Sequence, residues 1–350
     1  MTLGRALLSL LLLVLATPAA AQTIAQAAPT TKVVAAIMSP TGKLKVDVSL
    51  TPEGRIGYSV TRLGKPVIAE SRLGFLFTDA PQMLRNFALA GKTTRAFDKS
   101  WTEPWGEYGT IRDRYNELAL SFDEKSWDKR RLTIVFRVYD DGIGFRYELP
   151  KQPNFGHANI ADELTEFNLA EPGDAWWNEA FEWNREEYLI RRTPVEQIGT
   201  AQTPLTVRTT SGLHLSFHEA ALVDYSAMNL RRVGGRVLKA VLTPSASGPK
   251  VSRHAPFFTP WRVIMIAPDA PSLYRSAQII LNLNEPNRLG SMSWFKPMKY
   301  VGIWWDMHLD RKTWNSGPKH GATTAYTRQL IDFAAKNGFG GVLVEGWNKG

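Results

Sequence analysis

Residues 132–149, LTIVFRVYDDGIGFRYEL, carry the clearest indication of the fold. Apolar side chains occupy every second position on either side of Asp140-Asp141-Gly142, a combination typical of a tight turn. The alternating positions are Leu132, Ile134, Phe136 and Val138 before the turn and Ile143, Phe145, Tyr147 and Leu149 after it. Because successive side chains of a strand point to opposite faces, the pattern predicts a β-hairpin with one buried face.

The same alternation recurs in other parts of the chain. In residues 43–50, KLKVDVSL, every second residue from Leu44 to Leu50 is apolar, which predicts another strand. Residues 205–222, LTVRTTSGLHLSFHEAAL, predict a second hairpin with its turn near Ser211-Gly212. Short strand signals continue to about Asn282 without a long helical pattern. This region is therefore predicted to be mainly β, as a large antiparallel sandwich.

The pattern changes near residue 287. Residues 300–304, YVGIW, form a short apolar run without polar alternation, as in a strand that is covered on both faces. Thr323 or Thr324 then caps a predicted helix that stops at Asn337-Gly338. A second buried strand follows within residues 339–347, FGGVLVEGW. Together these elements predict a right-handed strand–helix–strand unit over residues 299–345.

One strand–helix–strand unit cannot close a barrel. The expectation is therefore that a (β/α) domain begins here and continues beyond Gly350. The predicted domains are a signal peptide at residues 1–21, a β-sandwich at 22–285 and the start of the barrel at 286–350. The signal peptide is predicted from Arg5, the following leucine-rich run and the small residues Ala19 to Ala21.

Composition narrows the possible functions. The chain has no cysteine, which excludes disulfides, a cysteine nucleophile and a lipid anchor after the signal peptide. The net charge of +9 is spread along the chain without a run of five basic residues, so nucleic-acid binding is not expected. No segment after the leader is long and apolar enough to cross a bilayer. An exported, periplasmic protein without a membrane anchor is expected.

Aromatic and acidic residues follow both strands of the predicted strand–helix–strand unit. Trp305 and Asp306 come at the end of the first strand, and Glu345 and Trp347 come at the end of the second. In (β/α) barrels this rim binds the substrate. Aromatic rings stack on the apolar faces of a sugar, and carboxylates accept hydrogen bonds from its hydroxyl groups. Packing between strand and helix is the alternative role for the neighbouring Trp304.

Several stretches together resemble glycoside hydrolase family 97. They are TPLTVRTTSGLHLSFHEAALVDYSAMNL, TPWRVIMI, LNLNEPN, KYVGIWWDM and IDFAAKNGFGGVLVEGWN. The resemblance extends from about residue 38 to the last residue. It implies an amino-terminal β-super-sandwich followed by a (β/α)8 catalytic barrel. This chain matches the sandwich and only the first strand–helix–strand unit of the barrel. The resemblance also implies a calcium-dependent exo-acting α-glucosidase or α-galactosidase acting on oligosaccharides.

The resemblance assigns roles to a few residues only. It points to Glu219 as the one calcium ligand that the sandwich supplies, with its side chain reaching into the mouth of the barrel. From its position in the sequence alone, Glu219 could also be a charged residue on the surface. His218 is expected on the opposite face of the same strand. Trp305, Asp306, Glu345 and Trp347 match the substrate-facing start of the barrel. No catalytic residue is assigned, since the family's catalytic carboxylates lie in later barrel strands, and the chain alone is expected to be inactive.

Two other classes of function remain open from the sequence. One is a non-catalytic carbohydrate-binding β-sandwich protein, which would have no use for the strand–helix–strand segment. The other is a mutarotase-like enzyme, which would need a His and Glu pair in a sandwich cleft; only His214, His218 and Glu219 come near such a pair.

Overall fold

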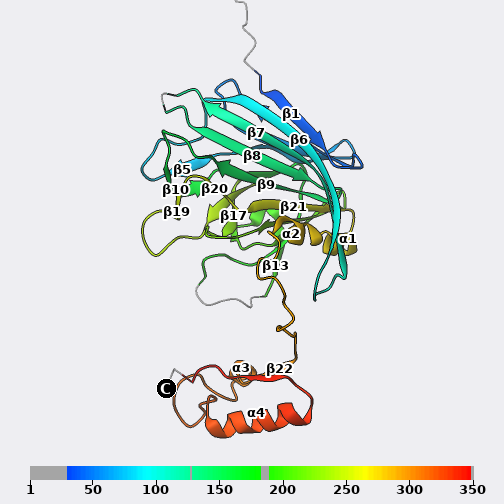
Figure 1. Ribbon diagram of the computed structural model, residues 1–350, viewed down its shortest axis with the longest axis vertical. Coiled ribbons are helices and arrows are strands. Elements are labelled where there is room, and N and C mark those ends of the chain that lie inside the picture. Colours follow the sequence, from blue (N-terminus) through cyan, green and yellow to red (C-terminus); the bar gives the residue numbers. More distant parts are fainter. Residues whose placement is uncertain (1–29, 127, 183–188, 348–350) are drawn as a thin grey trace, which may run out of the picture.

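A computed structural model describes residues 30–126, 128–182 and 189–347. The predicted signal peptide at residues 1–21 lies outside these residues. A large β-sandwich and a small α/β unit are joined by an extended linker (Figure 1). The structure is mainly β, as the sequence predicted.

The sandwich consists of two large antiparallel sheets and a small third one. The first sheet has the order β1 (Lys32–Met38), β2 (Leu44–Leu50), β3 (Ile56–Arg62), β4 (Lys65–Arg72), β11 (Glu166–Leu169), β18 (Val237–Leu242), β17 (Met228–Gly234) and β14 (Thr200–Ala201). The second has the order β13 (Arg191–Pro194), β12 (Gly173–Trp177), β15 (Leu205–Thr209), β16 (His214–Ala220), β21 (Trp261–Ala267), β9 (Gly142–Leu149), β8 (Arg131–Val138), β7 (Thr110–Glu124) and β6 (Phe87–Thr102), with β20 (Phe257–Phe258) also on β9. The third has the order β19 (Val251–His254), β10 (His157–Glu163) and β5 (Phe75–Phe77). A 3-10 turn, η1, covers Val195–Gln197.

The core lies between the two large sheets and confirms the predicted alternation. The hairpin of residues 132–149 forms as β8 and β9, and all eight of its alternating apolar residues are fully buried. The 205–222 hairpin forms as β15 and β16. Tyr58 of the first sheet packs on Phe145 of the second, with ring centroids 5.0 Å apart. Such inward-facing contacts hold the two sheets together by burying apolar surface.

Two short helices cover part of the outer face of the second sheet, and the sequence analysis missed both. They are α1 (Ala270–Arg275), which Asp269 caps by accepting a hydrogen bond from the Ser272 amide (2.7 Å), and α2 (Gln278–Leu283). Helix α2 packs over Gly142 and Gly144 of β9. A methyl group added at Gly144 would lie 2.6 Å from the side chain of Leu283. The two glycines therefore provide the space in which α2 sits.

The outer face of the same sheet also carries a stack of aromatic and guanidinium groups. Trp261 is buried between Arg137 and Arg146, each 4.6 Å from the centre of its ring. Arg137 also covers Tyr115 (4.7 Å), and Arg146 covers Phe258 (4.2 Å). The stack crosses several strands, and cation–π attraction strengthens its packing.

Asp113 lies near one end of this stack, and its ionisation should affect stability. Burial raises the pKa of Asp113 to about 6, although the nearby Arg137 opposes the rise. A folded-state pKa above the unfolded value means that the folded protein favours the protonated acid, so this group contributes a penalty that grows as the pH rises from 4 through 6. Asp113→Asn is therefore expected to stabilise the protein at pH 7.5 by about 1 kcal/mol after allowance for its partial exposure.

Urea denaturation at pH 4.5 and pH 7.5 measures this effect. The gain from Asp113→Asn should be complete at pH 7.5 and fall to about a third of that value at pH 4.5. Asp123→Asn is the matched control, because the hydrogen bond from Arg131 lowers the pKa of Asp123. An equal gain from Asp113→Asn at both pH values would show that its charge is not the cause.

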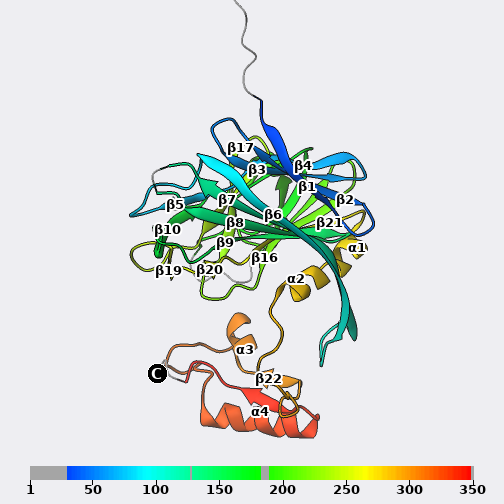
Figure 2. The ribbon, with the colours of Figure 1, turned by 45° about the horizontal axis from the view of Figure 1, so that its top comes forward.

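The long hairpin of β6 and β7 extends past the sheet toward the linker (Figure 2). The Trp101 indole donates a hydrogen bond to Asn282 Oδ1 of α2 (2.9 Å). The Tyr108 hydroxyl donates one to the carbonyl of Tyr274 in α1 (3.3 Å). The Trp105 ring near the hairpin tip packs on Phe295 of the linker, with centroids 4.8 Å apart. The hairpin thus braces both helices and the beginning of the second part of the chain.

The small α/β unit contains two parallel strands and two helices: β22 (Tyr300–Gly302), α3 (Trp304–His308), α4 (Thr324–Lys336) and β23 (Gly341–Leu343). As predicted, Thr323 caps α4 by accepting a hydrogen bond from the Tyr326 amide (3.2 Å), and the helix ends at Lys336, with Asn337 as its carboxy-terminal cap. The first strand is shorter than predicted, because the chain turns into α3 directly after Ile303. Among the described residues no helix is long and apolar enough to span a membrane.

Candidate functional site

The predicted sugar-facing residues lie at one edge of the parallel strand pair. β22 and β23 run in the same direction, with Gly302 opposite Leu343, so the segments that follow them start at the same edge. α3 follows β22 and carries Trp305 and Asp306. Glu345 and Trp347 follow β23. The structure thus brings the four residues to one edge, but it places the first two on a helix rather than at the end of a strand.

Trp305 is the exposed member of an aromatic cluster on α3. Its side chain is 56% exposed, and its ring lies 5.3 Å from that of Trp304 and 6.1 Å from that of His308. Trp304 lies edge-on to both neighbouring rings. An exposed ring held by two others is a suitable surface for stacking on a sugar.

Asp306 is held from both sides. The Tyr326 hydroxyl of α4 donates a hydrogen bond to Asp306 Oδ2, and Arg311 approaches Oδ1 at 3.8 Å. This hydrogen bond raises the pKa of Tyr326 to about 12. Asp306 therefore has a clear structural role in joining α3 to α4. The sequence did not indicate Tyr326 as its partner, because the two residues are 20 positions apart and lie on different helices.

Glu345 and Trp347 are both exposed, with Trp347 at 73%. Within the part of the chain that the structure describes, no hydrogen bond or ion pair engages the Glu345 carboxylate. Between the two residues, Gly346 has a φ of 80°, and a methyl group there would lie 2.9 Å from the Trp314 ring. Only glycine fits at position 346, because of the positive φ and because the Trp314 ring lies so close. The sequence alone did not indicate the contact with Trp314. Asn348, the next residue of the motif, lies outside the described residues.

Glu219 occupies a different environment from the one predicted. Its side chain points between the sheets of the sandwich, where it meets Arg262 of β21. Arg262 Nη1 donates to Glu219 Oε2 (2.6 Å), and Nη2 and Nε donate to the two oxygens of Glu163 on β10 (2.5 and 3.1 Å). Arg262 and Glu163 are fully buried, and Glu219 is 7% exposed. We call these three residues the Arg262 cluster.

Each carboxylate of the Arg262 cluster has further donors. The backbone amide of Met228 donates to Glu219 Oε1 (3.0 Å). The hydroxyl groups of Tyr225 (2.8 Å) and Thr165 (3.0 Å) donate to Glu163. Burial raises the pKa of Glu219, and the positive charge of Arg262 opposes that rise. Burial also disfavours the charge on Arg262, but attraction to Glu163 outweighs it and the pKa of Arg262 is raised. The cluster is therefore a fully hydrogen-bonded buried ion network.

This geometry does not fit a calcium ligand at Glu219. Calcium needs six or more oxygen ligands, and both Glu219 oxygens already accept hydrogen bonds, one of them from a guanidinium that would repel a cation. Within residues 30–126, 128–182 and 189–347, no three His, Asp or Glu side chains are grouped to hold a metal ion. His218 faces away from Glu219 on the other side of β16, as expected. Burial lowers the pKa of His218.

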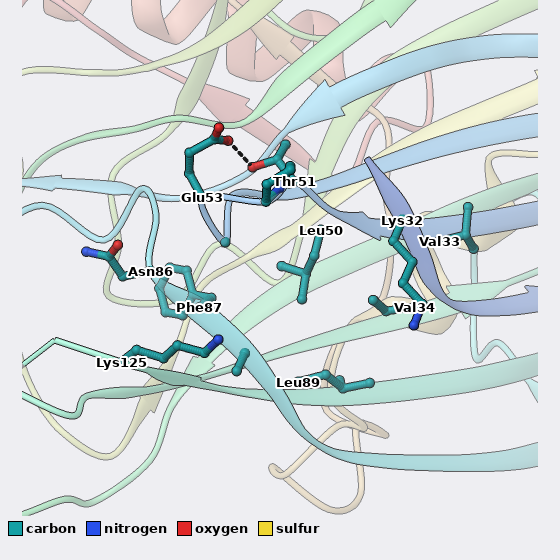
Figure 3. A pocket seen from close by; sticks show the side chains of 13 residues that line it. Lys32, Val33, Val34, Leu50, Thr51, Glu53, Asn86, Phe87, Leu89 and Lys125 are labelled. Carbon is teal, nitrogen blue, oxygen red and sulfur yellow. Dashed lines mark hydrogen bonds between the residues drawn. The ribbon is translucent and has the colours of Figure 1, made fainter. Parts of the chain in front are cut away.

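An open groove lies at the far end of the sandwich, where the described chain begins (Figure 3). It has a volume of about 500 Å³ and lies between the start of β1 and the start of β6. Lys32 and Lys125 border it, together with Glu53, whose carboxylate accepts a hydrogen bond from Thr51 (2.8 Å). The groove is distant from the edge of β22 and β23 (Figure 1). None of the candidate substrate-binding or calcium-binding residues lines it.

Comparison with known proteins gives matches along most of the chain. Residues 37–286 match the family model described as Glycosyl-hydrolase 97 N-terminal, and residues 304–350 match Glycoside hydrolase 97. A retaining alpha-galactosidase of Bacteroides thetaiotaomicron is 24% identical over 345 residues, which cover 89% of this chain and 50% of that protein. A probable retaining alpha-galactosidase of Streptomyces bingchenggensis is 25% identical, over 88% of this chain and 45% of that protein. The chain spans about half the length of these curated relatives.

Solved structures give the same result. A glycoside hydrolase family 97 enzyme from Pseudoalteromonas sp. strain K8, in complex with panose, superposes with a TM-score of 0.83 at 43% identity. The match covers 89% of this chain and 47% of that chain. The same enzyme is also known in complex with acarbose. A β-arabinopyranosidase shares the fold, with a TM-score of 0.72 at 19% identity.

Proposed function

Because this chain belongs to glycoside hydrolase family 97, we propose that it is part of an exported glycoside hydrolase that removes terminal α-glucosyl or α-galactosyl units from oligosaccharides. The observation that carries the proposal is the shared edge of β22 and β23, where two exposed tryptophans and two carboxylates follow parallel strands. The relatives support it: one binds panose and acarbose, and others are retaining alpha-galactosidases.

In this proposal the described residues bind and orient the sugar. Trp305 and Trp347 stack on its apolar faces, and Glu345 accepts hydrogen bonds from its hydroxyl groups. Asp306 fixes α3 against α4 through Tyr326, which keeps the Trp305 ring in place. Hydrolysis itself needs a carboxylic acid that protonates the leaving oxygen and a second carboxylate that attacks the sugar or activates water. We propose that later barrel strands supply both groups.

Export and a calcium requirement also belong to this proposal. Export is supported by the leader of residues 1–21, with Arg5, its apolar run and its small residues at the expected cleavage site. A bound calcium ion would supply positive charge near the reacting sugar. Since Glu219 is held by Arg262, we propose that the ligands of such an ion are other carboxylates of the enzyme.

A test of the sugar-binding edge uses a protein that carries this chain with a complete barrel. Trp305→Ala is expected to raise KM for p-nitrophenyl α-glucoside or α-galactoside by about tenfold, since one stacking contact contributes on the order of 1 kcal/mol or more. Glu345→Gln should have a similar but smaller effect. Steady-state kinetics on both substrates measure these changes.

Trp294→Ala is the matched control, because Trp294 is 70% exposed but lies in the linker. It should leave KM unchanged. An unchanged KM in Trp305→Ala would remove the edge of β22 and β23 from the binding site. Binding of the sugar without any turnover in the wild-type protein would instead favour the non-catalytic carbohydrate-binding alternative.

A further inference from the structure

The loop between β16 and β17, residues 221–227, has an unusual backbone. Ala221 has a φ of 54° and Asp224 a φ of 50°, both in the left-handed region. Residues other than glycine seldom adopt this conformation, and alanine has no polar side chain to favour it. Such conformations persist where the surrounding structure enforces them, and they concentrate at functional positions. We call residues 221–227 the seat loop.

The Arg262 cluster fixes the seat loop from inside the sandwich. Glu219 precedes the loop and accepts a hydrogen bond from the amide of Met228, the first residue after it, at 3.0 Å. The Tyr225 hydroxyl within the loop donates to Glu163 at 2.8 Å. The two carboxylates of the cluster therefore hold the end and the middle of the loop, and Arg262 holds both carboxylates.

Two contacts outside the Arg262 cluster complete this support. Arg253 Nη1 donates to the Asp224 carbonyl at 2.7 Å and also pairs with the Asp224 carboxylate. The Ala221 amide donates to Asn284 Oδ1 at 3.0 Å. Asn284 is the first residue after α2. The linker to the α/β unit therefore starts at the seat loop.

Despite this support, the seat loop exposes apolar side chains. Leu222 is 45% exposed and Val223 is 69% exposed. The α/β unit at the other end of the linker also exposes large apolar side chains, among them Leu309 at 44% and Phe333 at 51%. A rigid loop with apolar side chains at its tip is suited to contact another surface.

We propose that the seat loop is the surface of the sandwich on which the (β/α) part of the same polypeptide packs, through Leu222 and Val223. The Arg262 cluster, with Glu219, is the anchor of that loop rather than a cation site. The (β/α) part is the expected occupant because the linker that leads to it is bonded to the loop at Asn284. The proposal concerns how the two parts of the enzyme are joined and does not depend on the sugar that the enzyme cleaves.

The test uses a protein that carries this chain with a complete barrel. In the wild type, calorimetry should show coupled unfolding of the two parts. In the double variant Leu222→Asp/Val223→Asp, this single unfolding should separate into two transitions. The unfolding temperature of the sandwich should be unchanged. Limited proteolysis of the linker, residues 284–299, should become about tenfold faster, because the docked state that protects it is less populated.

Leu63→Asp/Val233→Asp is the matched control, since both residues are exposed apolar residues of the first sheet, Leu63 in the turn between β3 and β4 and Val233 near the end of β17. It should behave as the wild type does. Coupled unfolding and slow proteolysis in the seat-loop variant would overturn the proposal. Conversion of a wild-type dimer to monomers by that variant, seen by light scattering, would assign the seat loop to a second copy and overturn it as well.

The variant Glu219→Gln distinguishes two roles for Glu219, as an anchor of the seat loop or as a ligand of a cation. As an anchor variant it should speed linker proteolysis, as the loop variant does, and leave unchanged the Ca²⁺ concentration that half-restores activity after chelation. A tenfold or greater rise in that concentration, with unchanged proteolysis, would show that Glu219 binds the cation after all.

Discussion

Replacing Arg262 by leucine is expected to lower the free energy of unfolding of the sandwich by about 3–5 kcal/mol. Arg262 is fully buried and is the one cation between Glu163 and Glu219 in the cluster. Its removal leaves two buried carboxylates in the interior without their counter-charge. Chemical denaturation of the purified chain measures the loss.

Two comparisons isolate the cause of this loss. Arg131→Leu removes a pair with Asp123 that is about half exposed on both sides, and it should change stability little. Adding Glu163→Gln to Arg262→Leu removes one stranded charge and should recover part of the lost stability. If Arg262→Leu were as stable as the wild type, the buried network would have no role in holding the sandwich together.

Trp261→Ala is expected to be about as damaging, with a loss of about 3–5 kcal/mol. The Trp261 side chain is 1% exposed and fills the space between Arg137 and Arg146 on the outer face of the second sheet. Its removal leaves a cavity and takes the aromatic surface from both guanidinium groups. Thermal unfolding followed by circular dichroism measures the effect.

Trp294→Ala, at an exposed position, is the control and should unfold almost as the wild type does. Trp261→Phe keeps an aromatic ring between the two arginines and should lose less stability than Trp261→Ala. Equal losses in the two Trp261 variants would contradict this expectation, because they would mean that an aromatic ring between the two arginines does not reduce the cost.

The sequence predicted those features that depend on neighbouring residues. The alternation in residues 132–149 determines which face of β8 and β9 is buried, whatever else they contact. The Thr323 cap of α4 is equally local. Helix α2 was missed because its six residues, QIILNL, are too few to show a helical period and are as apolar as a strand. The position of α2 depends on the space above Gly142 and Gly144 of β9, which are distant from it in the sequence.

Some features of the candidate site could likewise be predicted from local sequence, and others could not. The order of strand, helix and strand was enough to bring Trp305 and Glu345 to one edge. The surroundings of Glu219 were not predictable, because Arg262 lies on β21 and Glu163 lies on β10, and no local pattern links them to β16. The family resemblance identified the stretch around Glu219 but did not indicate that its carboxylate is held by an arginine.

The position of β11 in the first sheet also has a consequence for how the chain folds. β11 lies between β4 and β18, and its Asn168 pairs with both Ala69 and Val237. A ribosome adds about 5–20 residues per second, so roughly ten seconds or more separate the synthesis of β4 from that of β18. Pairings between such distant segments form slowly even in a finished chain, on a timescale of milliseconds to seconds. The first sheet therefore cannot be completed until β18 has been synthesised, although the local pairs from β1 to β4 can form earlier.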